Sequence, residues 1–209
     1  MADVNLLIAF YSRNGSTERM ALEVAEGAMA AGADVRMRRA RDIVHEDIIT
    51  KVPGWRENRD RMHEAYAAPT EADAEWADGI IFGTPTRFGA VTAELKAFID
   101  SLGGSWFRGA LVGKAGSVFT STSTLHGGNE STLISLYNPM AHLGLILVPL
   151  GYADPVLFRA GTPYGSSTVS GQNNAPPTAD DLEVARFQGR RVAEVARALR
   201  NAGLTQRTR

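Results

Sequence analysis

The stretch VNLLIAFYSRNGST, at positions 4–17, decides the fold. Its first eight residues, 4–11, are almost all apolar, which is typical of a strand buried on both faces of a parallel sheet. A polar, glycine-containing turn follows at 12–17, and apolar residues then recur at helical spacing over 18–31, up to Gly32. A buried strand that leads through a short turn into a helix is a building unit of α/β folds.

The alternation of strand and helix continues to the end of the chain. Further strands are expected at 33–37, 78–84, 115–120 and 144–150, and further helices at 91–102, 132–142 and 180–202. Pro139 should bend the second of these helices or end it early. Five strands with crossover helices predict one doubly wound α/β domain over 1–209, with right-handed connections.

Two segments do not follow this alternation. Residues 42–75 are rich in charge, and we expect a loop with short helical pieces there. Residues 151–178 are rich in glycine, proline and hydroxyl side chains, without a clear period. A structureless stretch of that length inside a domain usually serves function or an interface.

Composition excludes several classes of protein. The 209 residues include no cysteine, which excludes a disulfide scaffold, a thiolate nucleophile and a redox dithiol. The net charge of −1 argues against a nucleic-acid partner, and no apolar run is long enough to span a membrane. With no signal peptide at the N-terminus either, we expect a cytoplasmic protein.

The loops after the first, third and fourth strands should carry the chemistry, because ligands of open parallel sheets bind beyond the carboxyl ends of the strands. The first loop, residues 12–17, combines three hydroxyl side chains, an amide and a glycine before a helix start, which favours a phosphate site. An ordinary helix cap is the alternative. No lysine follows Gly15, so this loop is not the P-loop of nucleoside triphosphatases.

The second and third loops are less specific when each is taken alone. Residues 85–89 place a proline, a hydroxyl, a guanidinium and an aromatic ring in succession, a set that could line a flat aromatic ligand or form a plain surface turn. Residues 121–129 offer small side chains and backbone donors. His126 and His142 lack the companion ligands of a metal site, and we expect none.

Taken together, these motifs resemble the WrbA family. The motifs are GTPTRFG at 83–89, GGSW at 103–106, SVFTSTST at 117–124 followed by GG at 127–128, AHLG at 141–144, GTPYG at 161–165 and ARFQGRRVA at 185–193. The family consists of flavodoxin-like, FMN-dependent NAD(P)H:quinone oxidoreductases. The resemblance implies a five-stranded parallel sheet of order 2-1-3-4-5 with helices on both faces.

The resemblance also implies roles for individual residues. The FMN site would consist of Ser12, Arg13, Asn14, Gly15, Ser16 and Thr17 around the phosphate, together with Pro85, Thr86, Arg87, Phe88, Ser121, Thr122, Ser123, Thr124, Gly127 and His142 around the flavin. Trp106 matches the aromatic side chain against which quinone or nicotinamide stacks, and His142 could hold a proton or an oxygen beside the flavin. Tyr152 matches a tyrosine that reaches a neighbouring subunit in the family's tetramers.

The function expected from this resemblance is two-electron reduction of quinone to hydroquinone, with NADH or NADPH as hydride donor and ping-pong kinetics. We also expect a homotetramer with residues 151–178 at the subunit contacts. Two alternatives remain open. One is a flavodoxin-type one-electron carrier, against which the near-neutral charge argues, and the other is a flavin-free protein-interaction module.

Overall fold

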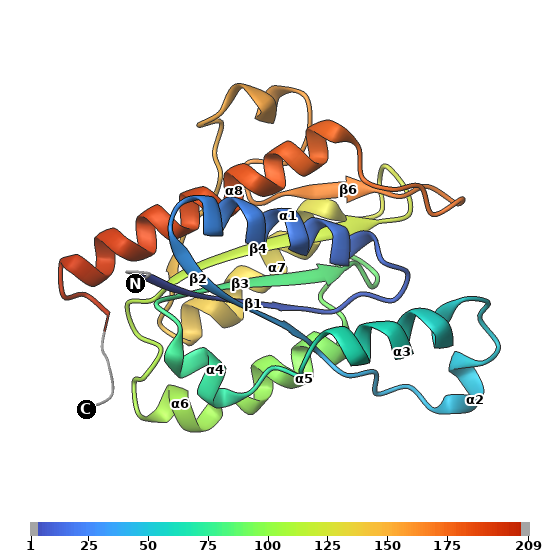
Figure 1. The fold of residues 1–209 in the computed structure, drawn as a ribbon, viewed down its shortest axis with the longest axis horizontal. Helices are drawn as coiled ribbons and strands as arrows, with labels where there is room; N and C mark the ends of the chain where they lie inside the picture. The colour runs from blue at the N-terminus through green and yellow to red at the C-terminus, as the bar shows by residue number, and fades with distance from the viewer. Residues whose placement is uncertain (1–3, 206–209) are drawn as a thin grey trace.

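A parallel sheet lies between two layers of helices in the computed structural model, which describes residues 4–205 (Figure 1). Its strands are β1 (Val4–Phe10), β2 (Ala33–Arg39), β3 (Gly79–Pro85), β4 (Ala115–Thr122), β5 (Ile146–Leu147) and β6 (Ser167–Val169). They follow the order β2-β1-β3-β4-β5, with β6 paired to β4, and every pairing is parallel. The predicted order 2-1-3-4-5 is therefore confirmed.

Strand β1 is buried on both faces, as its apolar run predicts. Leu6, Ile8 and Phe10 point to one side, where they pack with the helices α1 (Ser16–Ala30) and α8 (Ala179–Asn201). Their neighbours in the sequence, of which Leu7 is fully buried, point to the other side and pack with α5 (Ala93–Ser101) and α7 (Asn129–His142). Because successive side chains of a strand alternate between faces, this one strand joins both hydrophobic cores.

The fifth position of the sheet differs from the prediction. A continuous strand was expected at 144–150, but β5 covers only Ile146–Leu147 and pairs with the start of β4. Strand β6 pairs with the end of the same strand, at Thr120–Thr122. The segment between β5 and β6 leaves the sheet and returns to it, so two short strands share one position and part of 151–178 is ordered within its own chain.

The helices flank the sheet in two layers. They are α1 (Ser16–Ala30), α2 (Glu46–Ile49), α3 (Trp55–Ala65), α4 (Glu71–Trp76), α5 (Ala93–Ser101), α6 (Gly103–Phe107), α7 (Asn129–His142), α8 (Ala179–Asn201) and the 3₁₀ helix η1 (Pro155–Phe158). Helices α1 and α8 cover one face, and α4 and α5 lie on the other (Figure 1). Within residues 4–205, no helix combines the length and the hydropathy that a membrane crossing requires.

Three helical details correct the sequence prediction. Helix α7 begins earlier than expected and runs through Pro139 to His142, so the proline does not end it. A further short helix, α6, begins at Gly103, directly after the helix expected at 91–102. Residues 42–75 contain three helices, one of them eleven residues long, and are thus more helical than their charged composition indicates.

Helices α1 and α8 pack with their backbones in unusually close contact. A Cβ atom on Gly189 would lie 1.9 Å from the carbonyl oxygen of Val24, and one on Gly27 would lie 1.9 Å from that of Arg186. Only hydrogen fits at either position, so the two glycines set the distance between the helices that cover this face.

Replacing Gly189 with alanine should therefore destabilise the protein, despite the better helix propensity of alanine. We expect Gly189→Ala to lower the free energy of unfolding by roughly 3 kcal/mol, the upper part of the usual range for an overpacked core. Urea denaturation at neutral pH would measure it. Gly103→Ala is the matched control, since no atom lies within 4 Å of a Cβ built there. Equal stability of the two variants would contradict this account of the packing.

Candidate functional site

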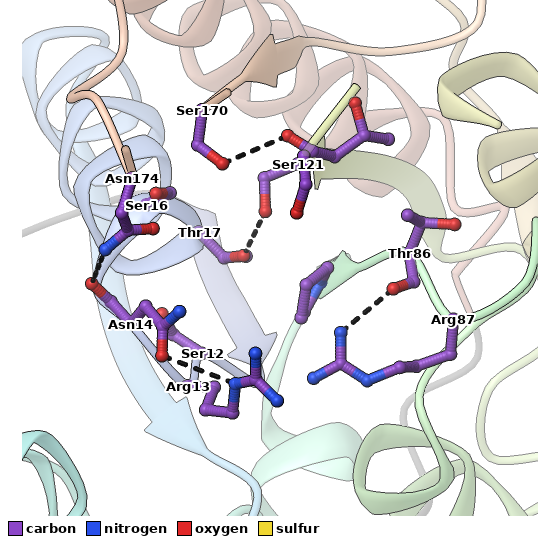
Figure 2. A pocket seen from close by; sticks show the side chains of 13 residues that line it. Ser12, Arg13, Asn14, Ser16, Thr17, Thr86, Arg87, Ser121, Ser170 and Asn174 are labelled. Carbon is purple, nitrogen blue, oxygen red and sulfur yellow. Dashed lines mark hydrogen bonds between the residues drawn. The ribbon is translucent and has the colours of Figure 1, made fainter. Parts of the chain in front are cut away.

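The loops after β1, β3 and β4 meet in one crevice at the carboxyl edge of the sheet (Figure 2). The residues that line it are Ser12, Arg13, Asn14, Ser16, Thr17, Pro85, Thr86, Arg87, Ser121, Thr122, Ser123, Ser170 and Asn174. The predicted convergence of the three loops is therefore present, and none of these lining residues is acidic.

The N-terminus of α1 faces this crevice with its backbone amides free of a side-chain cap. Gly15 occupies the cap position with a φ of 95°, a conformation that favours glycine, and provides no capping side chain. The hydroxyl of Ser12 accepts a hydrogen bond from the Gly15 amide at 3.1 Å and so closes the turn before the helix. Uncapped amides and the positive end of the helix dipole favour an anion here.

Hydrogen bonds lock the three loops to one another. The Thr86 amide donates to the carbonyl oxygen of Ser121 at 2.9 Å, which ties the second loop to the third. The hydroxyls of Thr17 and Ser121 are buried and lie 2.8 Å apart, which ties the first helix to the third loop. Each hydroxyl has one donor and two acceptor sites, so both keep capacity for a ligand.

Two lining residues come from the segment 151–178, which was expected at subunit contacts and not at the crevice. Ser170 follows β6, and its amide and hydroxyl donate to the carbonyl oxygen of Thr122 at 2.8 and 3.2 Å. Asn174 donates from its side chain to the carbonyl oxygen of Asn14 at 3.3 Å. The polar run STVSGQNN at 167–174 is the sequence feature that could have indicated these two site residues. Only the pairing of β6 with β4 brings this run to the crevice.

Four residues expected at the flavin do not line the crevice: Phe88, Thr124, Gly127 and His142. Thr124 is exposed, and Gly127 donates to its carbonyl oxygen in a turn beyond the crevice. Phe88 is fully exposed at the tip of a tight turn in which Arg87 and Ala90 exchange backbone hydrogen bonds. Its φ of 52° is strained for an aromatic residue.

The three residues expected to take part in catalysis also lie outside the crevice of their own chain. Trp106 and His142 line a separate hollow with Ile99, Asp100, Gly103, Pro139 and Leu143. Helix α7 starts near the carboxyl edge of the sheet, and its fourteen residues carry His142 about 21 Å away, to the amino edge. Tyr152 is exposed and stacks on Phe158, with ring centroids 5.2 Å apart.

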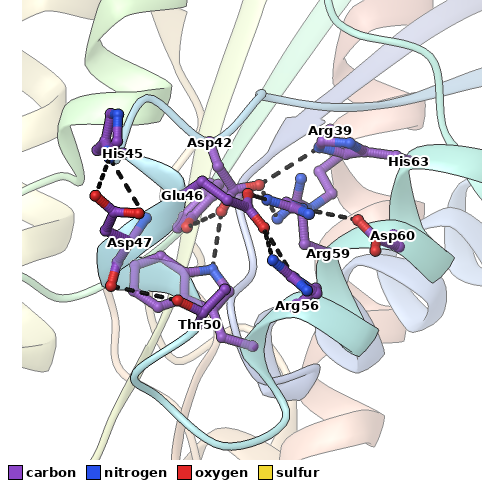
Figure 3. Close-up of polar contacts among 12 residues, drawn as sticks. Arg39, Asp42, His45, Glu46, Asp47, Thr50, Arg56, Arg59, Asp60 and His63 are labelled. Atoms are coloured by element: carbon purple, nitrogen blue, oxygen red, sulfur yellow. Dashed lines mark hydrogen bonds and ion pairs between the residues drawn. The ribbon is translucent and has the colours of Figure 1, made fainter.

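A buried polar network around Arg39 and Asp42 (Figure 3) contacts the first loop. Arg39 is fully buried at the end of β2, donates to the carbonyl oxygen of Ser12 at 2.9 Å and pairs with Asp42 at 2.9 Å. Asp42 also accepts hydrogen bonds from the hydroxyl of Tyr11 at 2.7 Å and the indole of Trp55 at 3.0 Å. The network thus connects the first loop to α3, inside the segment 42–75.

The charged state of Asp42 is stabilised in this network. Burial alone would raise its pKa, but the hydrogen bond from Tyr11 and the charge of Arg39 outweigh it and hold the pKa below the ordinary value. Burial raises the pKa of Tyr11, so its hydroxyl keeps the proton that it donates. Burial lowers the pKa of His63, whose Nε2 lies 3.4 Å from Asp42. Among the described residues, no group of three or more acidic or histidine side chains could hold a metal ion.

The amino-acid sequence matches the family model described as NADPH-dependent FMN reductase over residues 3–154. A protein of Deinococcus radiodurans called NAD(P)H dehydrogenase (quinone) is 42% identical over 199 residues, covering 95% of this chain and 98% of the relative. A relative of the same name from Aromatoleum aromaticum is 45% identical over 201 residues, with 92% and 95% coverage.

Solved structures agree with these sequence matches. A flavodoxin-like, WrbA-like protein from Agrobacterium tumefaciens superimposes with a TM-score of 0.65 at 30% identity, over 93% of this chain and 98% of the other. An archaeal flavodoxin superimposes with a TM-score of 0.58 at 18% identity, over 92% and 98% of the two chains, and shows the shared fold alone.

Removing the charge of Asp42 should cost stability in a pH-dependent manner. Asp42→Asn leaves the Arg39 guanidinium buried without its counter-charge, and we expect a loss of roughly 3–5 kcal/mol in the free energy of unfolding at pH 7. Because the pKa of Asp42 is lowered from 3.8 in the folded state, its contribution is present above that pH and is lost as the pH falls through the folded value.

The measurement is chemical denaturation of both proteins between pH 2 and pH 7. The difference between wild type and Asp42→Asn should shrink below about pH 4. Glu46→Gln is the control in the same segment, because Glu46 pairs with Arg56 and Arg59 at the surface and should matter little. A difference that is constant over the whole pH range would contradict the role of the Asp42 charge.

Proposed function

The chain belongs to the NADPH-dependent FMN reductase family, and from this premise we propose how its crevice serves an FMN-dependent NAD(P)H:quinone oxidoreductase. This activity is the one for which the relatives from Deinococcus and Aromatoleum are named. The observation that carries the proposal is the meeting of three polar loops at the uncapped N-terminus of α1, in a crevice lined by hydroxyls, amides and guanidiniums.

The residues of the crevice fit FMN. The amides of the first turn of α1 and the hydroxyls of Ser16 and Thr17 would hold the phosphate, with the helix dipole in place of a lysine. Pro85, Thr86 and Arg87 on one loop and Ser121, Thr122 and Ser123 on the other would hold the flavin between them. Asn174 and Ser170 would close the side next to β6.

Bound FMN supplies the redox chemistry, since its ring accepts a hydride from a reduced pyridine nucleotide and delivers two electrons to a quinone. The protein binds and orients the reactants. The hydrogen bonds between Thr86, Ser121 and Thr17 keep the second and third loops at a constant distance from α1. The nucleotide and the quinone would use the same crevice in turn, which predicts ping-pong kinetics.

Trp106, His142 and Tyr152 keep their predicted roles only if the protein assembles. All three lie away from the crevice of their own chain, so they would act at the crevice of a neighbouring subunit in a homotetramer. Large exposed apolar side chains support this assembly, because such groups are enriched at subunit contacts. They include Phe88, Phe107, Leu125, Tyr152 and Phe158.

The proposal extends to the organisation and location of the protein. Residues 1–209 would form one domain, since one sheet and its two helical layers account for the described elements. A cytoplasmic location suits the hydride donor, because reduced pyridine nucleotides are generated and consumed there. Quinone and pyridine nucleotide would be the partners, with no nucleic acid.

The test of the function is reconstitution followed by turnover. The purified protein should bind FMN with a flavin absorbance spectrum, bind riboflavin at least about 10-fold more weakly because the phosphate contacts are lost, and oxidise NADH or NADPH with benzoquinone as acceptor. Initial rates at several quinone concentrations should give parallel double-reciprocal lines.

Each alternative function has its own outcome. A protein that takes up no FMN would be an interaction module. One that binds FMN but hardly oxidises either nucleotide would be a one-electron carrier. Equal affinity for FMN and riboflavin would contradict the assignment of α1 to the phosphate.

The assembly has a separate test. Sedimentation velocity at micromolar concentration should give the mass of a tetramer, and Trp106→Ala should lower kcat/KM for benzoquinone by about 10-fold, with FMN affinity unchanged because the indole lies outside its own crevice. A monomer in solution with full quinone reductase activity would contradict the proposal.

A further inference from the structure

Two guanidiniums point toward one another across the crevice (Figure 2). Arg13 follows β1 and Arg87 follows β3, and both line the crevice. Neither forms an ion pair within residues 4–205: Arg13 donates from Nε to the side-chain oxygen of Asn14 at 3.3 Å, and Arg87 donates to the carbonyl oxygen of Thr86 at 3.0 Å. Most of their donors remain available to a ligand.

The two charges repel one another. Burial and then the charge of Arg13 lower the pKa of Arg87, while the opposing effects of Tyr11 and Glu94 are smaller. Two like charges held together at the mouth of a site raise its free energy unless an anion lies between them. The arrangement is therefore one that an anionic ligand would stabilise.

A side chain from the segment 42–75 holds Arg13 in position. Its guanidinium lies over the ring of Trp55, 5.1 Å from the centroid, and the Trp55 indole is held in turn by the carboxylate of Asp42. Trp55 is 5% exposed, so it forms a fixed surface under the arginine. This contact gives α3 a role that its sequence does not indicate.

The anion can be identified by its chemistry. The phosphate of FMN already has the amides at the N-terminus of α1, and a quinone carries no charge. Under the proposed function, on which this inference rests, the remaining anionic reactant is the pyridine nucleotide. We propose that the guanidiniums of Arg13, which the resemblance placed at the FMN phosphate, and of Arg87, which also borders the flavin, form a subsite for a phosphate group of this donor. Trp55 positions Arg13 for it.

Arginine suits this task, because its planar fork binds phosphate oxygens in pairs. Two groups of the donor share the required chemistry: the pyrophosphate, present in both NADH and NADPH, and the 2′-phosphate, present only in NADPH. The two sources give different results when the donors are compared.

The experiment compares both donors on wild type and Arg13→Met, which removes the charge and keeps much of the apolar stem over Trp55. Loss of charged hydrogen bonds should lower kcat/KM about 10–100-fold, mainly through KM. A loss confined to NADPH assigns the 2′-phosphate, and an equal loss for NADH and NADPH assigns the pyrophosphate. Calorimetric titration of the FMN-loaded protein with 2′,5′-ADP and with ADP-ribose should show the same pattern without turnover.

Controls separate this subsite from the rest of the site. FMN affinity should be unchanged in Arg13→Met, and Arg186→Met, which removes a surface arginine paired with Glu23 on the far helical face, should change neither donor. Trp55→Leu should reproduce part of the rise in the KM for the donor. Trp55→Phe, which keeps an aromatic face under Arg13, should return this KM to the wild-type value.

Two results would overturn the inference. One is a rise in the FMN dissociation constant of Arg13→Met with donor KM unchanged, which would assign Arg13 to the cofactor. The other is no change with either donor. The wild-type assay with benzoquinone tests the function independently, so failure of the subsite and failure of the enzyme assignment are distinguishable.

Discussion

The central position of β1 is the constraint on which the rest of the structure depends. This strand is hydrogen-bonded to β2 on one side and β3 on the other, and its side chains enter both cores. Such a strand cannot shift by one residue without exchanging its two faces. The turn that follows β1 is therefore held in place, together with the N-terminus of α1. The third loop is hydrogen-bonded to α1, and the second loop is hydrogen-bonded to the third.

Charge is distributed unevenly around this edge of the sheet. Several carboxylates of the segment 42–75 are paired with arginines outside the crevice lining, as Asp42 is with Arg39 and Glu46 is with Arg56. The crevice itself is lined only by neutral and cationic residues, with the end of a helix dipole added. A phosphate-bearing cofactor and a phosphate-bearing donor both suit such a surface, while a neutral quinone is not excluded by it.

Much of the site was predictable, for a local reason. Ser12 and Thr86 lie just after buried strands, Ser121 lies near the end of one, and Thr17 lies in the first turn of the helix that follows β1. The ends of strands in one parallel sheet meet at the same edge. Ser170 and Asn174 could not be found in this way, because β6 has only three residues and joins the sheet after a long excursion. Trp55 was missed for a similar reason, since its contact with Arg13 joins two segments 42 residues apart.

The sequence by itself determined the strand order, the three loops that meet at the crevice and the FMN cofactor that a chain without cysteine needs for redox chemistry. Each of these follows from local pattern, from composition or from family motifs. The tertiary structure alone decided the rest. It divided the fifth strand, carried α7 through Pro139, and placed Trp106 and His142 at the edge opposite the crevice. These outcomes depend on the free energy of contacts between distant segments, which the local pattern of a single segment does not predict.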